Sequence, residues 1–138
     1  MSNNKKSIRP NIINKSINDA MTKEEQFQNE VLRPILKMQH RILILIFKEY
    51  IKNRKILFAE ISNAKRKFFI ENSLSKDIAF KSELKGMIIG QFTEDEFEFY
   101  TTISSDVNKR IINLLKERFL TSITELLGEE TAEESVNE

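Results

Sequence analysis

The feature that most constrains the fold of this chain is a series of apolar residues that recur every three or four positions. One series runs from Phe27 to Ile46, and a second, with near-heptad spacing, runs from Phe97 to Phe119. This spacing places apolar side chains on one face of an α-helix, whereas the two-residue alternation typical of strands is missing over most of the sequence. Only three glycines and two prolines occur among 138 residues. The sequence therefore predicts an all-α protein.

Two capping boxes mark the predicted starts of the longest helices. In Thr22-Lys-Glu-Glu25 and in Thr93-Glu-Asp-Glu96, the threonine side chain can accept from the backbone N–H three residues on, and the glutamate can reach back. The predicted helices are two long, over about residues 23–53 and 94–127, and two short, over about 62–74 and 75–91, and the short ones could instead form one bent helix. Amphipathic helices of these lengths favour an antiparallel bundle of about four helices.

A few residues predict departures from straight helices. Pro34 removes one backbone donor, which predicts a kink or a short lead-in helix that breaks near Arg33. Ser104 falls in the apolar seam of the last helix and predicts a polar contact or a bend there. Gly86 and Gly90 stand four apart, which predicts close packing of another helix, with Gly90 helping to end its own helix.

Composition divides the chain into three parts. Residues 1–21 are rich in Asn, Lys and Ser and contain Pro10, which predicts a partly disordered N-terminal arm. This arm either docks its isoleucines on the body or on a neighbouring subunit, or is a floppy tail. Residues 22–127 are predicted to form a single helical domain. Residues 128–138 are predicted to be a disordered acidic tail that begins with Gly128, a candidate C-terminal helix cap.

The sequence predicts a cytoplasmic protein without a membrane span. The longest aliphatic run is Ile42 to Phe47, six residues, whereas a spanning helix needs about 20. The first residues, Met1 to Lys6, carry positive charge but no apolar stretch follows them, so a secretion signal is not expected. Cysteine is absent, which excludes disulfides, thiolate nucleophiles and cysteine-based zinc sites.

No catalytic, metal-binding or cofactor-binding residue is predicted. His40 is the only histidine, so one chain cannot supply a histidine metal cluster, and a Ser-His-Asp triad is not expected. The acidic residues 94–98 are explained by the helix dipole, which favours carboxylates in a first turn. An enzyme or small-ligand binder with a pocket between helices, using His40 or Tyr100, stays as an alternative.

Charge is distributed unevenly along the chain. Residues 33–85 contain 13 Lys and Arg against 5 Asp and Glu, a balance of +8, whereas residues 86–138 contain 4 against 12, a balance of −8. The basic residues around the first turn between helices could converge into one patch: Lys52, Arg54, Lys55, Lys65, Arg66 and Lys67. Such a patch is a candidate site for nucleic acid, another polyanion or an acidic protein.

The leading functional hypothesis is a non-enzymatic helical module that associates with itself or with another protein. Its basis is that the apolar seams of the two long helices exceed what a small bundle must bury alone. Val107, Ile111 and Leu114 are the candidate oligomer contact. If they were exposed, charge substitution there would give a soluble monomer, whereas unfolding of an Ile111→Glu variant would place them inside the domain.

Four segments carry a resemblance to a known family: Phe27-Gln-Asn-Glu-Val-Leu-Arg-Pro34, Ile70-Glu-Asn-Ser73, Leu84-Lys-Gly-Met-Ile-Ile-Gly-Gln-Phe-Thr93 and Asn108-Lys-Arg110. Over roughly residues 7–119 the chain resembles a family of small all-helical bacterial proteins that often carry the label "glyoxalase". That label implies metal-dependent isomerisation or lysis of a glutathione adduct. Enzymes of that name resemble βαβββ modules with His and Glu ligands, or hydrolases with several histidines. The resemblance thus implies a compact helical domain and assigns no catalytic residue.

Overall fold

Helices are the only regular secondary structure in the residues that the computed structural model describes, which are Arg9 and residues 22–128. The predicted all-α class is therefore confirmed for this part of the chain. The predicted N-terminal arm, apart from Arg9, and residues 129–138 of the predicted acidic tail lie outside the described residues. None of the helices formed by residues 22–128 combines the length and the hydropathy needed to cross a bilayer.

The first predicted long helix is divided into segments that follow one another directly or after one residue. They are Lys23–Phe27 (α2), the π-helix Gln28–Leu32 (η1), Arg33–Met38 (α3) and His40–Asn53 (α4). Pro34 lies in the first turn of α3, and the N–H of Arg33 donates to the carbonyl of Gln28, five residues earlier. The predicted disturbance near Arg33 is thus a change of helix type. A second interruption, at Gln39 (φ −94°, ψ 6°), was not predicted.

The two short helices predicted between the long ones are Asn63–Lys76 (α5) and Ile78–Ile89 (α6). The Ser62 hydroxyl accepts from the backbone N–H of Lys65 and starts α5. The Asp77 carboxylate accepts from the backbone N–H of Phe80 at 3.1 Å and starts α6. Because Asp77 has extended backbone geometry, α5 and α6 are separate helices.

The second predicted long helix is interrupted as well and consists of Glu94–Thr102 (α7), Ser104–Leu120 (α8) and Ile123–Leu126 (α9). Thr93 and Glu96 form the predicted capping box at its start. The bend predicted at Ser104 is found one residue earlier, where Ile103 has non-helical dihedral angles (φ −138°, ψ 36°). Gly128 follows α9 with φ +82°, a conformation that glycine adopts without steric cost.

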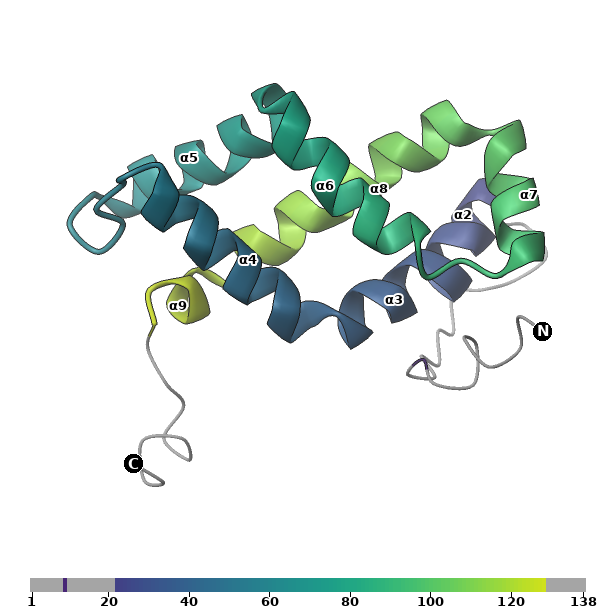
Figure 1. Ribbon diagram of the computed structural model, residues 1–138, viewed down its shortest axis with the longest axis horizontal. Helices are drawn as coiled ribbons and strands as arrows, with labels where there is room; N and C mark the ends of the chain where they lie inside the picture. Colours follow the sequence, from purple (N-terminus) through teal and green to yellow (C-terminus); the bar gives the residue numbers. More distant parts are fainter. Residues whose placement is uncertain (1–8, 10–21, 129–138) are drawn as a thin grey trace.

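Figure 1 shows how these helices are arranged. In this view α4 and α3 follow one another along the lower side of the molecule, α5 lies at the upper left, and α6 crosses the middle in front of α8. Helix α8 packs against both α5 and α6, and the short α9 packs against α4. The two interrupted helices therefore enclose the core from two sides.

The core contains the three residues predicted as an oligomer seam. Val107 and Ile111 have no exposed surface and Leu114 is 8% exposed within the single chain. They therefore pack inside the domain, and the prediction that they contact another subunit is wrong. Phe47 of α4 and Phe119 of α8, whose ring centroids lie 4.5 Å apart, join the two sides of this core.

The close helix packing predicted at Gly86 and Gly90 is not found among the described residues. A Cβ atom at Gly86 would meet nothing within 4 Å, and one at Gly90 would meet only carbonyl oxygens of its own helix. The predicted role of Gly90 in ending its own helix is confirmed, because Gly90 forms the C-cap of α6. Glycines four residues apart lie on one side of a helix, and this spacing predicts a packing face. That side of α6 has no close neighbour at Gly86.

Candidate functional sites

The predicted basic patch surrounds the turn between α4 and α5. Its members, of which all but the half-buried Arg66 are exposed, are Lys52, Arg54, Lys55, Lys65, Arg66 and Lys67. Both arginines have partners, because Arg54 pairs with Asp77 and Arg66 donates to the carbonyls of Phe58 and Ala59 at 2.8 and 3.0 Å. The four lysines have no ion-pair partner within the described part of the chain.

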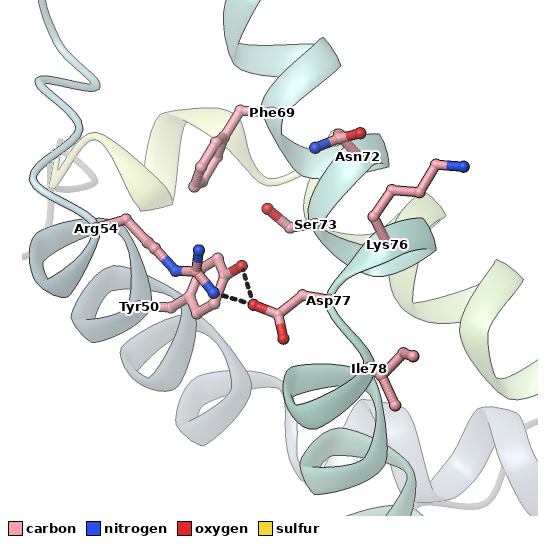
Figure 2. Close-up of a pocket in the computed structure, with 8 residues that line it drawn as sticks. All are labelled: Tyr50, Arg54, Phe69, Asn72, Ser73, Lys76, Asp77 and Ile78. Carbon is pink, nitrogen blue, oxygen red and sulfur yellow. Dashed lines mark hydrogen bonds and ion pairs between the residues drawn. The ribbon is translucent and has the colours of Figure 1, made fainter.

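Next to this patch, α4 meets the turn between α5 and α6 at an open cavity of about 420 Å³, shown in Figure 2. The Tyr50 hydroxyl donates to Asp77 Oδ2 at 2.7 Å, and the Arg54 guanidinium pairs with the same oxygen. The Arg54 guanidinium also lies over the Tyr50 ring, 4.9 Å from its centroid. The ring of Tyr50, which lines the cavity, stacks on the ring of Phe80, with ring centroids 3.8 Å apart.

The protonation chemistry of this network favours a structural role. Burial raises the pKa of the Tyr50 phenol, so it stays protonated at neutral pH. The hydrogen bond from Tyr50, followed by the backbone N–H of Phe80, lowers the pKa of the Asp77 carboxyl, so it stays ionised. Neither group is therefore suited to proton transfer near pH 7, which needs a pKa near the working pH.

A second cavity, of about 470 Å³, separates α3 and the start of α4 from the end of α8. His40, the only histidine in the sequence, lines this cavity and connects α4 to α8 and α9. Its Nε2 lies 3.0 Å from both carboxylate oxygens of Glu125, and its Nδ1 lies 3.0 Å from Nη1 of Arg118. The other residue predicted for a pocket between helices, Tyr100, donates to Asn108 at 2.8 Å and does not line this cavity.

A buried ion pair lies at the turn between α6 and α7. Arg9 donates to both carboxylate oxygens of Glu96, at 3.0 and 2.9 Å, and the side chains are only 5% and 8% exposed. Arg9 also donates to the backbone carbonyl of Gln91. The sequence assigns Glu96 to the capping box and to the favourable end of the helix dipole, and nothing in the sequence indicates its partner 87 residues away.

Several large apolar side chains remain exposed in the described part of the chain. Two of them, Ile42 and Leu45, are 47% and 43% exposed and lie one turn apart on α4. They occupy the side opposite Leu43, Ile44 and Phe47, which have no exposed surface. Sequence reasoning included Ile42 and Leu45 in the core-facing series, so this exposed face of α4 was missed.

Among Arg9 and residues 22–128, no group of three or more His, Cys, Asp or Glu side chains is placed to hold a metal ion. The metal chemistry implied by the label "glyoxalase" thus has no ligand set there. Comparison with known proteins finds no matching family model, no matching curated protein and no matching solved structure.

Proposed function

We propose that the protein is a non-enzymatic helical interaction module that self-associates through the outer face of α4. The observation that carries the proposal is the exposure of Ile42 and Leu45, one turn apart on a helix whose opposite side is fully buried. Fully burying an exposed side chain of this size gives about 1.5–3 kcal/mol, and covering the 47% and 43% of Ile42 and Leu45 that stay exposed gives part of this for each, which favours association. Exposed apolar residues that adjoin one another are typical of an interaction surface.

The charges beside these residues favour a second copy of the chain as the partner. Arg41 lies four residues before Leu45, and Glu49 lies four residues after it. In an antiparallel pair of α4 helices with a two-fold axis at Leu45, Arg41 lies opposite the partner subunit's Glu49, and symmetry repeats the pair. Neither Arg41 nor Glu49 has an ion-pair partner within the described residues of its own chain.

Size-exclusion chromatography with light scattering tests the proposal. We expect the natural protein to be a dimer and Leu45→Glu to be a folded monomer, because the substitution places two carboxylates together at the two-fold axis. Phe68→Glu is the matched control, since Phe68 is 70% exposed but lies on α5. A natural protein that is monomeric at every concentration, or equal dissociation by both variants, contradicts the proposal.

Charge reversal tests the antiparallel geometry separately. Arg41→Glu and Glu49→Arg should each weaken the dimer, because each places like charges opposite one another. The double variant restores opposite charges and should recover the dimer. If the double variant is weaker than both single variants, the two residues do not face each other across the interface.

Binding of a polyanion is a second candidate function, which the four exposed lysines without ion-pair partners favour. Fluorescence anisotropy with a single-stranded oligonucleotide measures it. We expect binding that weakens steeply with salt and that is lost when Lys52, Lys55, Lys65 and Lys67 are replaced by glutamine, because phosphate contacts release counterions. Equal binding by the natural protein and the variant contradicts this function.

A further inference from the structure

The cavity beside His40 has a wall that is rich in positive charge. Arg33 and Lys37 contribute from α3, and Arg118 contributes from α8. Among the described residues, Glu117 is the only carboxylate that lines it. Three cations against one carboxylate leave the lining with an excess of two positive charges when His40 is neutral.

Arg118 and Arg33 are close enough for their charges to interact unfavourably. Arg118 is half-buried, and burial lowers the pKa of its guanidinium, with the charge of Arg33 lowering it further. The Arg33 side chain donates to Asn29, a neutral acceptor, at 3.0 Å. Within the described residues no carboxylate forms an ion pair with either arginine. Two like charges are therefore held at one cavity without an ion-pair partner among the described residues, and the charges of Glu117 and Glu125 offset part of their repulsion.

His40 fixes the position of the Arg118 guanidinium. A guanidinium has only donors, so Nδ1 of His40 must accept from Arg118 and the histidine proton lies on Nε2. That N–H in turn faces the carboxylate of Glu125 on α9 at 3.0 Å. Because Arg118 uses one of its five N–H groups on a neutral acceptor, most of its donors stay available to a ligand.

We propose that this cavity binds the phosphate group of a small organic phosphomonoester. A phosphate dianion matches the excess of two positive charges, and its oxygens suit the planar donor arrangement of Arg33 and Arg118. Leu36 and Leu114 also line the cavity and provide an apolar contact for the organic part of the ligand. This site is separate from the exposed face of α4 that carries the proposed self-association.

Isothermal titration calorimetry with phenyl phosphate and with inorganic phosphate, at about 150 mM sodium chloride, tests the proposal. We expect saturable binding of phenyl phosphate at one site per chain, and weaker binding of inorganic phosphate because it lacks the apolar contact. Equal affinities for the two anions would overturn the organic part of the proposal, and absence of saturable binding would overturn all of it.

Substitutions show whether the named arginines form the site. Arg118→Gln and Arg33→Gln should each weaken phenyl phosphate binding by about tenfold or more, because each removes a charge-assisted contact. Lys23→Gln, on the exposed surface of α2, removes the same net charge and should leave the affinity unchanged. If Arg118→Gln does not fold, as circular dichroism shows directly, Arg33→Gln decides the question. Equal affinity in all variants would show general charge attraction and would overturn the proposed site.

Discussion

The Tyr50 hydroxyl donates a 2.7 Å hydrogen bond to the Asp77 carboxylate and so joins the end of α4 to the turn between α5 and α6. The same carboxylate accepts the backbone N–H of Phe80 and pairs with Arg54. One side chain therefore both starts α6 and connects it to a neighbouring helix.

Replacing Asp77 measures the contribution of this network to stability. Asp77→Ala removes the cap of α6 together with the acceptor for Tyr50, and we expect it to lower the free energy of unfolding by about 1–2 kcal/mol. Asp77→Asn keeps a capping oxygen and should cost less. Urea unfolding followed by circular dichroism gives both values, and equal stabilities for the alanine and asparagine variants would show that the cap contributes nothing.

The network also makes stability depend on pH. The hydrogen bonds from Tyr50 and Phe80 lower the folded-state pKa of Asp77 below its ordinary value of 3.8. A carboxyl group of this kind contributes stability that is fully present above 3.8 and is lost as the pH falls through the folded-state pKa. The stability difference between the natural protein and Asp77→Asn should therefore shrink between about pH 7 and about pH 3. Urea unfolding at each pH tests this, and a constant difference would contradict it.

Ile111 tests the assignment of the α8 seam to the core. Ile111 has no exposed surface, so Ile111→Ala should lower the free energy of unfolding by about 2–5 kcal/mol without changing the oligomeric state. Ile111→Glu should unfold the protein, because it buries an unpaired carboxylate. Asn113→Ala, at an exposed position of the same helix, is the control. A stable, folded Ile111→Glu protein would show that the seam is not internal.

Arg9 should stabilise the fold although it lies far from Glu96 in the sequence. Arg9→Met removes both hydrogen bonds to the Glu96 carboxylate, and breaking a buried ion pair costs about 3–5 kcal/mol. Lys23→Met removes an exposed charge and serves as the control. Thermal and urea unfolding measure the difference, and indistinguishable stabilities for the two variants would contradict a stabilising role for Arg9.

Replacing Arg118, unlike replacing Arg9, should not lower the stability of the fold. Its replacement by glutamine relieves the burial of its charge and its repulsion from Arg33, which offsets the lost hydrogen bond to His40. We therefore expect Arg118→Gln to be within about 0.5 kcal/mol of the natural protein or more stable. Urea unfolding decides the point. A loss of more than about 2 kcal/mol would show that Arg118 is needed for folding and would weaken the case for a ligand site.

Much of the secondary structure could be predicted because its causes are local. The capping box at Thr93 and the helix-ending role of Gly90 depend on residues within one turn. The interruption at Gln39 could not be predicted, because residues 38–40 contain neither glycine nor proline. Its cause is not visible in the local sequence.

The candidate sites were harder to predict than the helices. The basic patch around Lys52 was recognised as a run of charge, but the pairing of Arg54 with Asp77 depends on how α4 meets α6. A periodic series also does not show which of its members face the core. Ile42 and Leu45 belong to such a series and are exposed, whereas Val107 was predicted as a contact surface and is buried.

The sequence by itself determined the helical class and the starts of α2, α5 and α7, because periodicity and capping act over a few residues. The tertiary structure decided which charges meet. His40 and Arg118 are 78 residues apart, and Arg9 and Glu96 are 87 apart, so no local pattern relates them. The packing of α8 and α9 against α4 brings two arginines, a lysine and the single histidine to one cavity. Such long-range contacts follow from how the helices bury their apolar faces.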